Sequence, residues 1–194
     1  FVSEKMKKAE LDLDELELKP FFSLDNVLSG IFEIVKKLYD LEFKENFDIQ
    51  RYNNEVRVFE VYKNTKFYAL LYADFFPRLG KRDGAWMTSF RSQKKNQRPH
   101  VSIVCNFSRP TRTKPSLLTF QEVTTLFHEF GHALHGILAN SSYSSLSGTN
   151  VYWDFVELPS QIMENWCYEK EALLIYAKHY KTGKVLPRKF IEKI

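Results

Sequence analysis

Two histidines and a glutamate between positions 128 and 132 have the types and the spacing of a metal centre. His128 and His132 are four residues apart, so a helix of about 3.6 residues per turn places both imidazoles on one face. Glu129 lies beside them and could take a proton from water held at the ion. Two neutral imidazoles suit Zn²⁺, and this arrangement is typical of a zinc peptidase.

A pair of helical histidines can also be ordinary surface or core residues, so a metal site needs a helix and a third ligand. The helix is indicated by Thr119 and Glu122, which have the spacing of a capping box. Apolar residues then recur at helical spacing, namely Val123, Leu126, Phe127, Phe130 and Leu134. We therefore expect a helix whose second and third turns carry the histidine pair.

The candidates for the third ligand are His135 and carboxylates further along the chain. His135 lies another turn along the helix, too far from an ion held by the first two histidines, so we expect it to pack or to act from nearby. Glu157 and Glu164 fall on one face of a second amphipathic helix. Asp154 could open that helix, and Pro159 should kink it near the first of the two glutamates. The pattern leaves the choice between these carboxylates open.

A small antiparallel sheet is expected over residues 55–107, just before the metal-binding helix. Its expected strands are residues 56–62, 66–76, 85–90 and 100–107, and a short turn at residues 63–65 should join the first two as a hairpin. An exposed edge strand could pair with an extended peptide beside the metal. We take the strand that begins at Ala85 and Trp86 as this edge, with a fully covered sheet as the alternative.

The polar loop 140–150 joins the two expected ligand-bearing helices and must lie near the site. Gly148 is its expected hinge. The loop is either a flexible linker or a segment that contacts substrate, with Gly148 and Thr149 as the candidate contacts.

The sequence resembles the thimet oligopeptidase, oligopeptidase A and peptidyl-dipeptidase Dcp family of zinc metallopeptidases. The segments that carry this resemblance are 84–87, 105–107, 128–135, 146–150 and 154–166. They extend over nearly the whole chain. The resemblance implies a mainly α fold with a small antiparallel β-sheet, the zincin-like catalytic region of a two-lobed helical peptidase.

The resemblance also implies a role for individual residues. His128 and His132 match the two histidine ligands, and Glu157 matches the third ligand. Glu129 matches the catalytic acid and base. Three further residues could orient the ligands without binding the metal themselves, namely His135, Asp154 and Glu164.

We predict one unit over residues 1–194, a fragment of a peptidase catalytic domain. Residues 1–50 are expected to be helical, with Ser23 capping an amphipathic helix, residues 55–107 to form the sheet, and residues 119–194 to form the zinc-binding helices. The ends at Phe1 and Ile194 look like cuts through a larger protein. The resemblance places a loop with Tyr and His donors to the reaction's oxyanion beyond Ile194. We therefore expect the isolated fragment to cleave peptides poorly.

Composition excludes several other classes of protein. The net charge is +4 with acids and bases interspersed, and the basic stretch 91–98 has polar rather than aromatic interleaving, so we expect no nucleic-acid partner. No apolar run is long enough to cross a bilayer, and no secretory leader is visible, so we expect no membrane partner and a cytoplasmic location.

We predict zinc-dependent hydrolysis of short oligopeptides, with one Zn²⁺ per chain. The segment 146–150 favours a peptidyl-dipeptidase that releases C-terminal dipeptides. The alternatives are an endopeptidase like oligopeptidase A and a catalytically silent peptide-binding scaffold. An intact Glu129 argues against the scaffold, because binding alone needs no general base.

Overall fold

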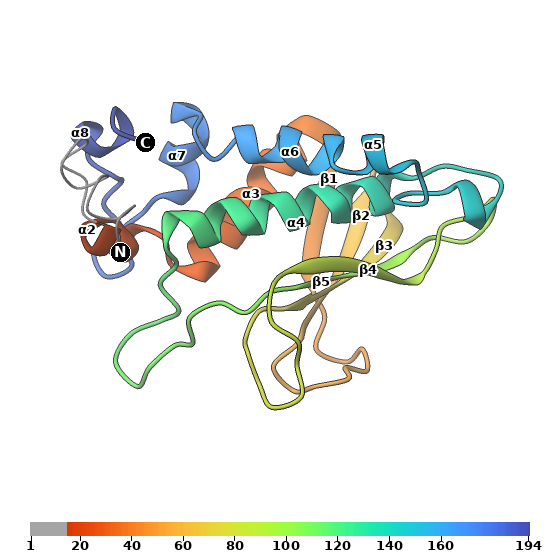
Figure 1. Ribbon diagram of the computed structural model, residues 1–194, viewed down its shortest axis with the longest axis horizontal. Helices are drawn as coiled ribbons and strands as arrows, with labels where there is room; N and C mark the ends of the chain where they lie inside the picture. Colours follow the sequence, from red (N-terminus) through yellow and green to blue (C-terminus); the bar gives the residue numbers. More distant parts are fainter. Residues whose placement is uncertain (1–14) are drawn as a thin grey trace.

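Residues 15–194 are described in the computed structural model of the protein, and they form a five-stranded sheet with helices packed against it (Figure 1). The strands are β1 (Leu41–Glu45), β2 (Arg57–Lys63), β3 (Lys66–Asp74), β4 (Trp86–Arg91) and β5 (His100–Val104). Their spatial order is β1-β2-β3-β5-β4, so within the described residues β1 and β4 are the edges. The prediction that the strand near Trp86 is an edge is therefore confirmed.

The sheet is mixed, and the expectation of a purely antiparallel sheet is wrong. β3 and β5 run parallel, with Leu70 opposite His100 and Asp74 opposite Val104, whereas the other three pairs are antiparallel. The cause is the order in which the chain lays down its strands. After β3 the chain first forms β4 at the edge in the reverse direction, and it then reverses again to insert β5 between them.

The hairpin expected near residue 64 is present as β2 and β3. Its turn residues Asn64 and Thr65 have φ angles of 49° and 63°, the left-handed conformation that a tight hairpin turn requires. β1 was not expected, because it lies in the region predicted to be helical. It begins because Asp40 (φ 57°) ends the preceding helix, after which Leu41 turns into the core and pairs with Lys63.

The helical elements are α2 (Glu15–Leu18), η1 (Lys19–Phe21), α3 (Leu24–Tyr39), α4 (Phe120–Leu138), η2 (Ser144–Leu146), α5 (Trp153–Val156), α6 (Leu158–Asn165), α7 (Lys170–Tyr176) and α8 (Arg188–Ile191). Ser23 caps α3 as predicted, with its Oγ accepting a hydrogen bond from the Asn26 amide at 3.4 Å. The helical prediction for residues 1–14 lies outside the described residues. In the part of the chain that the structure describes, every helix is too short or too polar to cross a membrane.

Helix α4 lies between the sheet and α6 (Figure 1). The predicted capping box is present at its start: the Glu122 amide donates to Thr119 Oγ1 at 3.1 Å, and the Thr119 amide donates to Glu122 Oε2 at 2.8 Å. At its other end the Arg98 guanidinium donates to the carbonyls of Ile137 and Ala139 at 2.6 and 3.1 Å. Side-chain hydrogen bonds therefore hold both ends of α4, the helix that carries the histidines.

A buried ion pair joins the ends of the parallel strands β3 and β5. The Lys81 ammonium, 3% exposed, donates to Asp74 Oδ1 at 2.9 Å and to the carbonyls of Phe76 and Cys105 at 2.8 and 2.5 Å. Burial raises the Asp74 pKa, but hydrogen bonds from Arg78, Lys81 and Tyr52 outweigh it and hold this pKa below its usual value. The cluster thereby anchors the loop that leads into β4.

We expect Lys81→Met to lower the free energy of unfolding by about 3 kcal/mol. The substitution removes one partner of the buried Asp74 carboxylate and the hydrogen-bond donor to the carbonyls of Phe76 and Cys105. Urea unfolding at pH 7 measures this change. Because the folded pKa of Asp74 is depressed, the stabilisation is present above the ordinary pKa of 3.8 and is lost as the pH falls through the folded value. The matched control is Lys184→Met at an exposed position. Equal stability of the two variants would contradict the anchor.

Candidate metal centre

Three candidate ligands converge from α4 and from the junction of α5 with α6. Glu157 Oε2 lies 3.2 Å from His128 Nε2 and 3.0 Å from His132 Nε2. Among the described residues these three are grouped as able to hold one metal ion, with their ligand atoms within 4.8 Å of one another. Zinc with tetrahedral ligands at about 2.0–2.1 Å separates neighbouring donors by about 3.3 Å. The donor types and spacings therefore fit zinc.

Glu157 stands where the chain bends between two short helices. Its φ and ψ are −84° and −10°, and it ends α5 and directly precedes α6. Pro159, predicted to kink the chain here, lies in the first turn of α6. The Ser160 hydroxyl lies 2.9 Å from Glu157 Oε2 and 2.8 Å from the Glu157 carbonyl, and it is fully buried. This contact positions the carboxylate.

Sequence reasoning missed Ser160. Its position three residues after Glu157 is the spacing at which a serine returns a hydrogen bond to an earlier residue, and this was the available signal.

Gly131 allows α6 to approach α4 closely enough for Glu157 to reach both histidines. A Cβ at this position would lie 2.6 Å from Ser160 Cα and 2.7 Å from the Pro159 carbonyl oxygen, both of them backbone atoms. Such contacts are too short, so any side chain here must push α6 away. The glycine between Glu129 and His132 therefore has a packing function in building the site.

We expect Gly131→Ala to lower the free energy of unfolding by about 1–3 kcal/mol through overpacking. We also expect zinc to bind more weakly, because Glu157, the candidate third ligand, directly precedes the displaced α6. Calorimetric unfolding and zinc titration measure the two effects. Gly183→Ala is the comparison for zinc binding: this glycine has open space around it, and its φ of +67° makes the cost of a side chain there backbone strain and not overpacking. Unchanged zinc affinity in Gly131→Ala would show that α6 does not set the ligand distance.

Glu164 acts on the opposite side of one imidazole ring. Its Oε1 lies 2.5 Å from His128 Nδ1, whereas His128 Nε2 faces Glu157. In the tautomer with its proton on Nδ1, His128 donates to Glu164, and its Nε2 lone pair on the Glu157 side is left to bind an ion. Glu164 is placed to orient a ligand, and Glu157 is placed to be one.

Two other candidates lie outside the ligand cluster. The His135 ring contacts the Phe155 ring edge to face, with centroids 6.2 Å apart, and its buried Nδ1 has no hydrogen-bond partner among the described residues. Asp154 is exposed and faces a separate hollow beside Leu146 and Tyr152. The structure therefore does not bring His135 or Asp154 into contact with the three ligands.

Glu129 is buried beside the cluster. It is 6% exposed, and its Oε2 has no hydrogen-bond partner among the described residues. Burial raises the pKa of Glu129 to about 7; His128 opposes this rise and Glu157 adds to it. Burial also lowers the pKa of His132, which favours the neutral imidazole that binds metals. A carboxyl group with a pKa near neutrality suits a general base.

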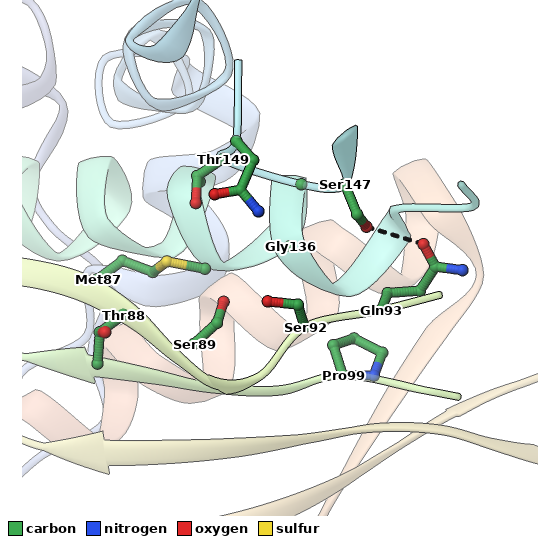
Figure 2. A pocket seen from close by; sticks show the side chains of 11 residues that line it. Met87, Thr88, Ser89, Ser92, Gln93, Pro99, Gly136, Ser147 and Thr149 are labelled. Carbon is green, nitrogen blue, oxygen red and sulfur yellow. Dashed lines mark hydrogen bonds between the residues drawn. The ribbon is translucent and has the colours of Figure 1, made fainter. Parts of the chain in front are cut away.

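The expected substrate contacts fall in two places. Trp86 begins the edge strand β4, opposite Val104, and Ala85 precedes it. Gly148 and Thr149 line a cavity together with residues of β4, whereas Ala85 and Trp86 are not part of its lining (Figure 2). The loop and the edge strand are thus close together on the α4 side of the sheet.

The whole chain, residues 1–194, matches the family model described as peptidase family M3. The chain belongs to this family. Similar M3 sequences include dipeptidyl carboxypeptidase of Escherichia coli (strain K12), 43% identical, and oligopeptidase A of Salmonella typhimurium, 42% identical. A thimet-like oligopeptidase of Dictyostelium discoideum is 36% identical. The predicted family is therefore confirmed.

These alignments cover all of this chain but only part of each M3 relative. They include 29% of the dipeptidyl carboxypeptidase and 30% of both the oligopeptidase A and the thimet-like oligopeptidase. The chain therefore spans about three tenths of the length of these curated M3 relatives.

Proposed function

We propose that this chain contains the zinc centre of a peptidase that hydrolyses short oligopeptides and releases C-terminal dipeptides, with one Zn²⁺ per chain. The observation that carries the proposal is the convergence of His128, His132 and Glu157 beside a buried carboxyl group. His128 and His132 lie 3.2 and 3.0 Å from Glu157 Oε2, and burial raises the pKa of Glu129 to about 7. A structural metal site would not need such a base.

The chain's own residues divide the chemistry between them. His128, His132 and Glu157 would hold zinc, which when bound polarises a peptide carbonyl and lowers the pKa of water. Glu129 accepts a proton from the attacking water and delivers it to the leaving amine. Its burial favours both steps, because a carboxylate of raised pKa accepts a proton readily and releases it to a more basic amine.

The edge strand β4 supports an extended substrate in this proposal. Its outer edge, which has no partner strand among residues 15–194, begins at Trp86 and offers backbone groups for pairing with a peptide, with Ala85 and Trp86 nearest the end of β5. Cys105 follows β5, and its pKa is raised first by burial and then by the Glu129 charge, which supports a position of this end of the sheet near Glu129. Gly148 and Thr149 would contact the substrate from the loop opposite.

We propose a zincin-like arrangement within a two-lobed helical peptidase, a cytoplasmic location, and no nucleic-acid or membrane partner. Arg98 from the basic stretch is already engaged by the carbonyls of Tyr68, Ile137 and Ala139, which supports a structural role for that cation.

Internal cleavage is the second candidate activity. It is supported by the 42% identity to a protein named oligopeptidase A, against 43% for the one named dipeptidyl carboxypeptidase. Mass spectrometry of the products separates the two. Successive loss of two residues from the C-terminus supports the first candidate, and cuts that do not depend on the distance to the C-terminus support the second.

Metal analysis followed by a peptide-cleavage assay tests the proposal. The protein that carries this chain should contain close to one zinc per chain, lose hydrolysis of short peptides with a chelator, and regain it when zinc is added. Full activity in metal-free protein would contradict the zinc mechanism. Bound zinc with no hydrolysis of any short peptide would contradict the peptidase.

A further inference from the structure

A polar cavity of about 270 Å³ lies between the edge strand β4 and the loop that carries Ser147 and Thr149 (Figure 2). In Figure 2, Ser89 and Ser92 lie on the β4 side and Thr149 lies on the loop side. None of the 11 described residues that line the cavity is charged. Its volume falls below the range of about 300–1,000 Å³ typical of drug-sized ligands, so it suits one residue of a longer molecule.

Gln93 fastens the loop over this cavity. Gln93 is 2% exposed, and its Oε1 accepts hydrogen bonds from the Ser141 amide and the Ser147 hydroxyl, both at 2.8 Å. Its Nε2 donates to the Ser141 carbonyl at 3.0 Å. One buried amide thus holds the loop at two points six residues apart in sequence, and Figure 2 shows the bond to Ser147. Removing it would take this partner from the buried Ser147 hydroxyl and from the part-buried amide and carbonyl of Ser141.

Gly136 of α4 and Gly148 of the loop lie where the loop packs on α4, and the Met87 side chain of β4 reaches Gly136. A Cβ at Gly136 would lie 2.8 Å from Met87 Cε, and a Cβ at Gly148, whose φ is +59°, would lie 3.1 Å from Gly136 Cα. Gly136 is four residues after His132, a distance along the helix of about 6 Å. An extended peptide advances about 3.3 Å per residue, so about two residues span the rise from His132 to Gly136, and we take this span as the offset between the cavity and a carbonyl at the candidate ligands.

We propose that Gln93 is a positioning residue that holds the loop 141–150 over β4 and so completes a subsite for an uncharged polar residue of the peptide substrate, about two positions from the scissile bond. This inference rests on the proposed peptidase function. The hydroxyl and amide groups that line the cavity can both donate and accept hydrogen bonds, so they fit a hydroxyl or amide side chain. A charged side chain would be desolvated there without a counter-ion.

The test measures peptide binding in the zinc-loaded Glu129→Gln protein, so that substrates are held without turnover. The probes are two pairs of short peptides, and the two members of each pair differ only in carrying Ser or Lys at one position. That position is two residues before the bond that the unmodified protein cleaves in one pair, and two residues after it in the other. We expect one pair to show roughly tenfold tighter binding of the Ser peptide, and we expect Gln93→Met to abolish that preference with zinc content unchanged. Gln121→Met, exposed at the start of α4, should retain it.

A second measurement reads the loop directly. Hydrogen exchange at the Ser141 amide should accelerate in Gln93→Met, whereas exchange at amides in the middle of α4 should not change. If Gln93→Met does not fold, Ser147→Ala removes a single bond of the clamp and should weaken the preference in the same direction. A preference that survives both changes, or that is absent from the parent protein, would overturn the subsite.

Failure of the subsite can be told apart from failure of the proposed function. If zinc-loaded protein binds the Ser peptide selectively through Gln93 but cleaves no peptide, the proposed subsite is supported and the proposed peptidase function is contradicted. In that case no cleaved bond is known, so the probe residue is placed two positions before or after the central bond of the peptide. If peptides are cleaved and neither KM nor binding depends on Gln93, the peptidase stands and the subsite does not.

Discussion

We expect Glu129→Gln to leave zinc bound and to lower kcat/KM for short peptides by about 10²–10⁴-fold, the typical contribution of general acid–base catalysis. Glutamine has nearly the shape of glutamate but cannot accept the proton. His128, His132 and Glu157 are unchanged, so the ligand cluster should persist. The measurement combines steady-state kinetics with zinc analysis in the protein that carries this chain.

Glu122→Gln is a matched comparison on the same helix. Glu122 belongs to the capping box of α4, so its replacement should affect stability while leaving kcat/KM per folded zinc-bound molecule unchanged. Turnover close to normal in Glu129→Gln with zinc bound would remove Glu129 from the mechanism.

The pH profile should carry the signature of the same carboxyl group. Because only the ionised form of Glu129 accepts a proton, kcat/KM should fall as the pH drops below its pKa, by about tenfold per unit. Burial raises that pKa from 4.5 to about 7, and a cation at the ligands favours the charged form. The acid limb should therefore lie between these two values and disappear in Glu129→Gln. If the acid limb is unchanged in Glu129→Gln, the ionisation that causes it belongs to another group.

Glu157→Ala should have the largest effect on the metal. Removing one of three protein ligands leaves two imidazoles, too few for a stable zinc site, so zinc stoichiometry should collapse at submicromolar free metal. The loss of peptide hydrolysis should follow the loss of zinc. Inductively coupled plasma analysis after dialysis against buffered zinc measures the stoichiometry.

Glu164→Ala separates the ligand from the residue that orients it. Because Glu164 contacts His128 at Nδ1 and not at Nε2, the atom that faces Glu157, we expect zinc affinity to fall by about 10–100-fold without abolishing the site. Glu171→Ala, exposed on α7, should bind zinc normally. Full zinc in Glu157→Ala together with none in Glu164→Ala would exchange the two assignments.

Local sequence patterns determined the helix that carries the histidines and its starting point. The capping box at Thr119 and Glu122 joins residues three positions apart, and the spacing of His128 and His132 is set by the helical repeat. The hairpin turn near residue 64 was readable for the same reason. Such features depend on neighbours within a few residues, and their physical causes are visible in the sequence.

The parallel pairing of β3 with β5 could not be read from the same patterns. Strand direction within a sheet depends on which strands become neighbours, and here β5 enters between β3 and β4 after β4 has formed the edge. The alternation of apolar residues is compatible with either direction.

The site itself required contacts between residues far apart in the sequence. The sequence pattern admitted both Glu157 and Glu164 as the third ligand, and only the packing of α6 on α4 at Gly131 sets one against the Nε2 atoms and the other against Nδ1. Gln93 had no local signal, because its partners Ser141 and Ser147 lie about 50 residues away. Burial likewise raises the Glu129 pKa only once the surrounding elements exclude water. The residue types and the helical spacing were therefore determined locally, whereas the ligand distances, the clamp and the electrostatics were decided by tertiary packing.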